Sequence, residues 1–360
     1  MTDTAPDTAS GTGPAAACPR CREPVDEHRF CESCGHDLWL RRGGAARPPT
    51  GPCPGCGANG ARPASGIGVD AAGEDYCGTC GLRLPDGTEH VEADLGRIAG
   101  VSDRGLVHVR NEDAMAVGLL AAPGRPPVIA AIVCDGVSTV DAPELASRAG
   151  ADAALERLLG PGGPDMAGAV AAAAAAVAEL AEAHHRNPPS CTLVAAVVEP
   201  GGEPGGESGG GPLITVGWVG DSRAYWLAAP DAAEPSRLLT VDHSWAVEMI
   251  STGALDAETA LADRRAHAIT RWLGAGGEPE PDVVTLRPAG PGLLLLCSDG
   301  LWNYVPRPTD LAEVALPALA RGGPAEVARL LTTIALDAGG RDNVTVVAVP
   351  VGPPEERRTG

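Results

Sequence analysis

Four Cys-x-x-Cys pairs near the N-terminus limit what this chain can fold into more than any other feature. Nine residues separate the first two pairs and twenty separate the last two. A segment this small cannot fold on its own apolar surface, but four thiolates on two tight turns can bind one zinc ion tetrahedrally. The pattern therefore predicts two zinc ribbons, one held by Cys18, Cys21, Cys31 and Cys34 and the other by Cys53, Cys56, Cys77 and Cys80.

Two other uses of such cysteines are less compatible with the sequence. Disulfide-stapled loops belong to oxidising compartments, whereas Met1–Ala17 carries aspartate and no positive charge, unlike a secretory signal. A redox Cys-x-x-Cys normally occurs once, beside a βαβ pattern. Gly35, Gly57 and Gly81 follow the second cysteine of three pairs, where a tight turn favours glycine. We therefore expect a cytoplasmic protein with two bound zinc ions.

The net charge of the chain limits the classes of molecule that it can bind. The 360 residues carry a formal charge of −20, which disfavours direct contact with nucleic acid or anionic membranes. No stretch is long and apolar enough to span a bilayer. Aromatic residues make up only 3% of the chain, so the core must be aliphatic.

Three aspartates in similar settings form a second group of candidate ligands. Asp135 and Asp299 each follow an apolar run typical of a buried strand, and Asp342 precedes one. Carboxylates that converge at strand ends repel one another unless cations neutralise them, and oxygen ligands suit Mg²⁺ or Mn²⁺. An Asp-Gly pair alone indicates only a hairpin turn. The three settings together predict a divalent-metal site.

Composition and periodicity divide the chain into six segments. They are a disordered tail at 1–17, a first zinc ribbon at 18–41, a linker at 42–52, a second zinc ribbon at 53–88, a large domain at 89–351 and a disordered tail at 352–360. In the large domain the patterns predict strands at 128–133, 192–198, 213–219, 223–227, 293–297 and 344–349, and helices at 142–159, 166–185, 245–252, 309–320 and 325–338. Paired strands and runs of helices favour an α+β fold.

An ordered series of motifs covers most of this large domain. It begins with Ser102-Asp103-Arg104-Gly105, Asn111-Glu112-Asp113 and Asp135-Gly136 and ends with Cys297-Ser298-Asp299-Gly300 and Arg341-Asp342-Asn343. In this order the motifs resemble those of the metal-dependent (type 2C, PPM) protein serine/threonine phosphatases, of a bacterial, actinobacterial-like kind. The resemblance implies a four-layer α-β-β-α sandwich, two antiparallel sheets flanked by helices, after the two ribbons.

The resemblance also implies roles for individual residues. Asp135 would bridge two Mn²⁺ or Mg²⁺ ions, the carbonyl of Gly136 would bind one, and Asp299 and Asp342 would bind the other. A hydroxide that bridges the ions would attack the phosphorus of phosphoserine or phosphothreonine. Glu112 and Asp113 would hold water molecules on the ions. Asp221 would either join Asp299 at a third ion or simply form a turn.

Two departures from the family pattern concern substrate binding. An arginine that clamps the phosphate in the family is replaced by His108, and Arg110 stands two residues further on. If this segment were a strand, both side chains would lie on one face of it, so Arg110 could take over the clamp. Val137-Ser138-Thr139 also replaces a segment that is usually rich in glycine.

Three functions fit these observations. The first is an active phosphatase that opposes a serine/threonine kinase, acts on phosphoprotein substrates and uses its ribbons for docking or regulation. The second is a pseudophosphatase that binds phosphoproteins with little or no turnover. The third is a zinc-ribbon adaptor in a transcriptional or translational complex. The intact Asp135, Asp299 and Asp342 favour the first.

Overall fold

The structure is a computed structural model of the whole chain. It describes residues 17–26, 28–43, 52–53, 55–58, 76–82, 84–182, 186–201 and 210–352. The two predicted disordered tails, except their inner residues Ala17 and Gly352, lie outside the described residues, and so does most of the predicted linker.

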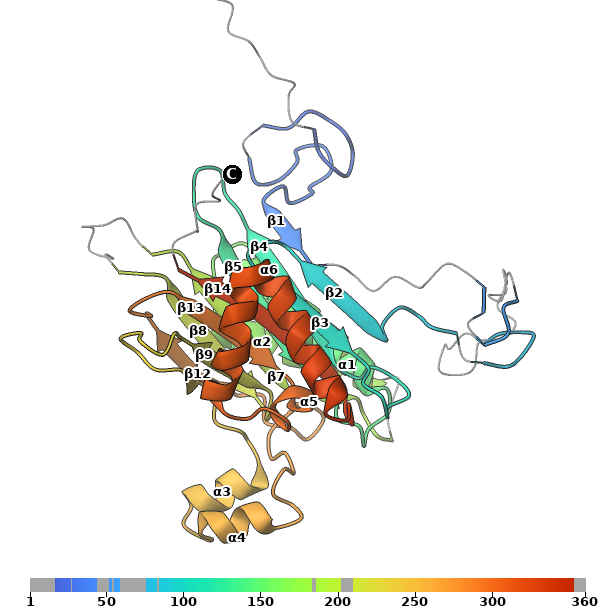
Figure 1. Cartoon of the computed structure of the whole chain (residues 1–360). Helices are drawn as coiled ribbons and strands as arrows, with labels where there is room; N and C mark the ends of the chain where they lie inside the picture. Colours follow the sequence, from blue (N-terminus) through green and yellow to red (C-terminus); the bar gives the residue numbers. More distant parts are fainter. Residues whose placement is uncertain are drawn as a thin grey trace, which may run out of the picture.

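Two six-stranded antiparallel sheets form the centre of the molecule (Figure 1). The first sheet has the order β1 (Leu40–Arg42), β4 (Ala114–Leu120), β5 (Val128–Cys134), β7 (Leu193–Glu199), β8 (Leu213–Val219) and β12 (Asp282–Leu286). The second has the order β10 (Arg237–Leu238), β9 (Arg223–Leu227), β13 (Gly292–Cys297), β14 (Val344–Val351), β3 (Ala99–Asp103) and β2 (His90–Asp94). A small pair joins β6 (Ser190–Cys191) to β11 (Leu273–Gly274).

Helices cover the outer face of each sheet (Figure 1). Helices α1 (Pro143–Leu159) and α2 (Met166–Glu179) pack on the first sheet, and α5 (Asp299–Trp302) and α6 (Pro308–Asp337) pack on the second. Two short helices, α3 (Trp245–Ser251) and α4 (Ala257–Ala262), pack on each other away from the sheets. The predicted four-layer α-β-β-α sandwich is therefore confirmed.

Three apolar layers explain why the central strands are apolar without interruption. On β5, Ala131 and Val133 lie in the core between the sheets, whereas Ala130 and Ile132 lie in the core under α1 and α2. A third core joins β13 and β14 to α6. Because both faces of these strands are buried, neighbouring residues are all apolar instead of alternating with polar ones.

The predicted strands and helices of the large domain are present, most of them to within two residues. The helix expected at 166–185 ends at Glu179, because a tighter 3₁₀ turn follows at Leu180–Glu182. The two helices expected at 309–320 and 325–338 are the two halves of α6, which is broken at Gly323, where φ is +73°. Seven strands of the large domain were not predicted: β2, β3, β4, β6, β10, β11 and β12. All but β4 are short or mixed in polarity and depend on pairing with a neighbouring strand, whereas β4 is a seven-residue apolar run that the sequence could have indicated.

The first cysteine module is built into the large domain. Its last residues form β1, which pairs with the edge strand β4 so that Leu40 lies opposite Leu120 (Figure 1). Arg29 donates a hydrogen bond of 2.6 Å to the carbonyl of Leu159 at the end of α1. Arg42 forms an ion pair of 3.2 Å with Glu156 on the same helix. The module therefore covers the edge of the first sheet, a position that leaves backbone groups unpaired when nothing covers it.

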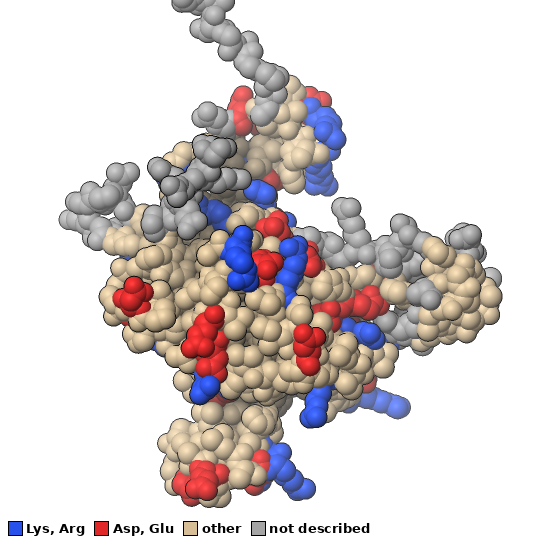
Figure 2. All heavy atoms as spheres, in the orientation of Figure 1, with Lys and Arg blue, Asp and Glu red and all other residues tan. Residues whose placement is uncertain are grey.

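No helix in the described ranges is long and apolar enough to cross a membrane. On the face that carries α6, Figure 2 shows acidic and basic side chains interspersed, without a continuous basic surface.

Candidate active site and cysteine modules

The structure brings each predicted set of four cysteines together. In the first set the Sγ atoms of Cys18 and Cys34 are 3.7 Å apart and those of Cys21 and Cys31 are 3.6 Å apart. In the second set the corresponding distances are 3.6 and 3.7 Å. All ligand atoms in each set lie within 4.8 Å of one another. A tetrahedral ZnS₄ group with Zn–S bonds of about 2.3 Å has sulfur atoms about 3.8 Å apart, so both sets fit zinc.

The same backbone turn recurs at every Cys-x-x-Cys pair. The residue directly after a pair's second cysteine donates its backbone N–H to the carbonyl of the pair's first cysteine at 2.8–2.9 Å. Gly35, Gly57 and Gly81 occupy this position with φ near +70°, as their place in the sequence predicted. In the remaining turn Arg22 adopts φ of +68° without the freedom of glycine.

The environment of the thiols favours a bound cation over disulfides. None of the eleven cysteines, all of which are described, forms a disulfide. Backbone N–H groups of Cys80 and Thr79 donate to Cys77 and lower its pKa to about 6, whereas neighbouring thiols raise the pKa of Cys80 to about 12. Four thiolates this close together repel one another unless a cation such as zinc neutralises them. The interpretation as disulfide-stapled loops is therefore not supported by the geometry.

The sheet topology brings the three strand-end aspartates to one end of the sandwich. Strands β13 and β14 are antiparallel neighbours, with Cys297 opposite Val346, so Asp299 at the end of β13 lies near Asp342 at the start of β14. A Cβ atom at Gly300 would collide with the backbone of Asn343, so the turn after Asp299 can approach β14 this closely only with glycine.

Asp135 reaches the same end from the other sheet. It follows β5, and its carbonyl accepts a hydrogen bond of 2.8 Å from the N–H of Thr192. Its carboxyl group interacts electrostatically with those of Asp113, Asp299 and Asp221. The predicted ligands therefore converge, although they come from two sheets and from distant parts of the sequence.

Burial raises the pKa values of these carboxyl groups, and their mutual repulsion adds to the effect. The pKa values of Asp113 and Asp299 rise to about 7 and that of Asp221 rises to about 8. The pKa of Asp135 rises well above its ordinary range, first through burial and then through the charge of Asp113. Several buried acids whose ionisation is this unfavourable are typical of a site that a cation stabilises.

The carboxylates are spread more widely than the cysteines. Within the described part of the chain, the cysteine sets are the groups of three or more potential ligands that lie within 4.8 Å of one another. Two cations about 3.5–4 Å apart distribute their ligands over a larger space than one cation does. An all-oxygen donor set suits Mg²⁺ or Mn²⁺, and ligands too far apart for one ion are compatible with two.

Glu112 and Asp113 lie next to the cluster and are held by side chains from other elements. Asp113 is 5% exposed and accepts a hydrogen bond of 2.7 Å from the hydroxyl of Ser298. The carboxylate of Glu112 accepts one of 2.6 Å from Ser138, and its backbone N–H donates to the side chain of Asn343 at 2.8 Å. Both acids are therefore fixed in position beside the three strand-end aspartates.

The segment from Arg104 to Arg110 is a loop, so the expectation that it is a strand was wrong. The carboxylate of Asp103 accepts the N–H of Gly105 at 2.8 Å and turns the chain away from β3. His108 and Arg110 consequently do not share a strand face. His108 Nε2 lies 3.3 Å from Asp342 Oδ1, whereas Arg110 Nη1 lies 3.7 Å from Glu144 Oε1 on α1.

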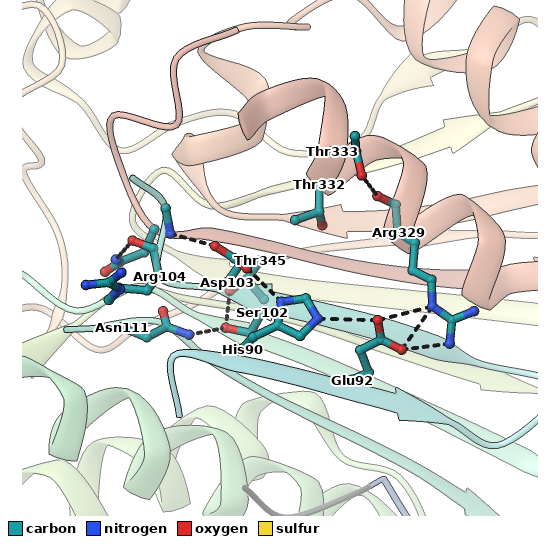
Figure 3. Close-up of polar contacts among 12 residues, drawn as sticks. His90, Glu92, Ser102, Asp103, Arg104, Asn111, Arg329, Thr332, Thr333 and Thr345 are labelled. Carbon is teal, nitrogen blue, oxygen red and sulfur yellow. Dashed lines mark hydrogen bonds and ion pairs between the residues drawn. The ribbon is translucent and has the colours of Figure 1, made fainter. Parts of the chain in front are cut away.

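A polar network links the residues that flank this loop to strands β2 and β14 (Figure 3). His90 on β2 contacts Asp103 at 2.6 Å, and this hydrogen bond raises the pKa of the imidazole. Asn111 donates to Ser102 at 2.9 Å, and the Ser102 hydroxyl lies 2.8 Å from that of Thr345 on β14. The network joins the start of the large domain to the strands that lead into the carboxylate cluster.

The sequence alone did not reveal several residues that position the site. Ser138, Ser298 and Asn343 each make a side-chain contact with Glu112 or Asp113. Ser298 and Asn343 are adjacent in sequence to Asp299 and Asp342, and that adjacency was the available signal. The contact of Ser138 could not be anticipated, because it depends on the fold of the loop after Asp135.

Comparison with known proteins gives consistent results. No family model matches the chain. The chain is 36% identical over 136 residues to the serine/threonine phosphatase stp of Listeria monocytogenes, a match that covers 38% of this chain and 51% of that protein. It is 33% identical over 263 residues to the serine/threonine protein phosphatase PstP of Mycobacterium tuberculosis, which covers 71% of this chain and 45% of that protein. The chain thus spans about half the length of the curated relatives it matches.

Solved structures extend the similarity over the whole large domain. The crystal structure of the M. tuberculosis phosphatase PstP/Ppp matches with a TM-score of 0.55 and 27% identity, covering 71% of this chain and 98% of that one. The catalytic domain of PstP in complex with two manganese ions matches with a TM-score of 0.52 and 30% identity over the same shares. Together with the sandwich fold and the carboxylate cluster, these matches show that the chain belongs to the PPM family of serine/threonine phosphatases.

Proposed function

We propose that this protein is a metal-dependent protein serine/threonine phosphatase that hydrolyses phosphoserine and phosphothreonine. The observation that carries the proposal is the convergence of Asp135, Asp299 and Asp342, from two sheets, at one end of the sandwich. Asp135 and Asp299 are buried acids with raised pKa values, a combination that is typical of an active site and destabilising in a merely structural role.

We infer that Asp135, the carbonyl of Gly136, Asp299 and Asp342 would together hold two Mn²⁺ or Mg²⁺ ions. The PstP structure that contains two manganese ions supports this number. Such ions would activate a water molecule and screen the charge of the phosphoryl oxygens. Asp221 is 7% exposed and interacts with Asp299, which supports a role at a third ion.

The chain's own residues would orient the reactants. Glu112 and Asp113, fixed by Ser138 and Ser298, would hold water molecules in the position from which one attacks the phosphorus. His108 lies beside Asp342, and we infer that it contacts the phosphate. Arg110 faces Glu144 instead, so its contribution to phosphate binding would be smaller.

The cysteine modules would hold one zinc ion each. Because the first module is part of the sheet through β1, its role would be to stabilise the domain, which leaves docking or regulation to the second. Substrates would be phosphoproteins, including the targets of a serine/threonine kinase, in the reducing cytoplasm where thiolates persist. The domain limits proposed are 18–41 and 53–88 for the modules and 89–351 for the phosphatase.

The decisive experiment measures hydrolysis of p-nitrophenyl phosphate and of a phosphothreonine peptide with Mn²⁺, with and without a chelator. Asp299→Ala should reduce turnover by about two orders of magnitude or more, because a metal ligand is lost. Asp231→Ala, an exposed aspartate away from the cluster, is the matched control. Full activity in excess chelator would contradict the mechanism. Metal-dependent peptide binding without turnover would instead establish the alternative, a pseudophosphatase.

A further inference from the structure

The loop beside the carboxylate cluster exposes three large aliphatic side chains. Leu106 and Val107 are each 67% exposed and Val109 is 70% exposed. We call these three residues the apolar rim. Single exposed aliphatic residues are common on protein surfaces, but three exposed within four residues of one loop indicate contact with another molecule.

The backbone of this loop is held by hydrogen bonds. The N–H of Leu106 donates to the carbonyl of Gly340 at 2.7 Å. The side chain of Asn343 donates to the carbonyls of Arg104 and Arg110 at 2.7 and 2.9 Å, one at each end of the loop. The apolar rim is therefore presented to solvent by an anchored backbone, so a ligand would not have to order the loop.

The apolar rim is continuous with the proposed phosphate site. His108, which lies between Val107 and Val109 in sequence, reaches Asp342 in the cluster at 3.3 Å. At the other end of the loop Arg110 lies 3.7 Å from Glu144. His108 and Arg110 thus face acids of the protein, whereas most of the surface of Leu106, Val107 and Val109 is exposed to solvent.

We propose that the apolar rim binds aliphatic side chains that flank the phosphorylated residue of a substrate polypeptide. The proposal rests on the phosphatase function proposed above and adds a sequence preference to it. An extended peptide advances about 3.3 Å per residue, so a rim next to the phosphate site contacts residues within about three positions of the phosphorylated one. Aliphatic side chains of the rim would bind aliphatic side chains of the substrate, because contact between them removes apolar surface from water.

The test compares two phosphothreonine peptides with Mn²⁺, one with leucine and valine around the phosphothreonine and one with serine at the same positions. The wild-type protein should hydrolyse the aliphatic peptide with a kcat/KM about tenfold higher, mainly through a lower KM. The double variant Val107→Ser/Val109→Ser should lose this preference. Leu261→Ser, at an aliphatic residue of α4 that is also exposed, should keep it.

Two results would overturn the proposal: equal kcat/KM for both peptides in the wild-type protein, or an unchanged preference in the double variant with a normal melting temperature. Hydrolysis of p-nitrophenyl phosphate by the wild-type protein, which involves no flanking residues, reports separately on the proposed phosphatase function. If that hydrolysis is absent, calorimetric affinities for the two peptides still decide whether the apolar rim selects aliphatic neighbours.

Discussion

Replacing Asp113 with asparagine should make the metal-free protein more stable at neutral and alkaline pH. Asp113 is buried and its pKa rises to about 7 from an ordinary 3.8, chiefly through burial. One pKa unit corresponds to about 1.4 kcal/mol, so the shift amounts to about 4 kcal/mol. Between these two pH values the folded protein retains a proton that the unfolded chain has lost. The free energy of unfolding therefore falls as pH rises from about 4 to about 7.

The assay is the melting temperature of chelator-treated protein at pH 5, 6, 7 and 8. Between pH 5 and 8 the ionisation of Asp113 should lower the free energy of unfolding of the wild-type protein by about 3 kcal/mol. For a domain of this size, that corresponds to a fall in melting temperature of about 6–12 °C. Asp113→Asn has no charge to bury, and its amide oxygen can still accept the hydrogen bond from Ser298. Between pH 5 and 8 the free energy of unfolding of the variant should therefore fall by about 3 kcal/mol less than that of the wild-type protein.

Controls separate this effect from other titrations. Asp231→Asn, at an exposed position, should follow the wild-type protein at every pH. Saturating Mn²⁺ should reduce the difference between Asp113→Asn and the wild type, because cations neutralise the cluster. If wild type and Asp113→Asn lose the same number of degrees between pH 5 and 8 in chelator, the reasoning from buried carboxyl groups is refuted.

Three further predictions concern the cysteine modules and the phosphate site. Metal analysis of the full chain should find two zinc ions, and Cys53→Ser should lose one, whereas disulfides in freshly purified protein would contradict the assignment. A chain that begins at His90 should melt several degrees below the full chain, since it lacks β1 and the contact of Arg29 with Leu159; an unchanged melting temperature would argue against a stabilising role. His108→Arg should lower KM for p-nitrophenyl phosphate about three- to tenfold, because arginine is a permanently charged, bidentate donor. If Arg110→Ala changes KM more than His108→Arg does, Arg110 and not His108 contacts the phosphate.

Local sequence patterns predicted those parts of the protein that are determined by residues close together in the sequence. The cysteine spacing predicted both modules, because a tight turn sets the distance between the two thiols of a pair whatever lies around it. Continuous apolar runs predicted β5, β7, β13 and β14, because a strand buried on both faces needs no polar residue. The ends of these strands also located Asp135, Asp299 and Asp342.

Only the tertiary structure decided what depends on neighbours distant in sequence. Strand β1 is three residues long and includes two arginines, and it forms because the edge of β4 offers unpaired backbone groups. The segment around His108 has the composition of a strand, but Asp103, Gly340 and Asn343 hold its backbone as a loop. That loop separates His108 from Arg110 and exposes the apolar rim. Hydrogen bonds to partners more than two hundred residues away in sequence leave no periodicity for a local pattern to detect, so these features appear only once the chain is folded.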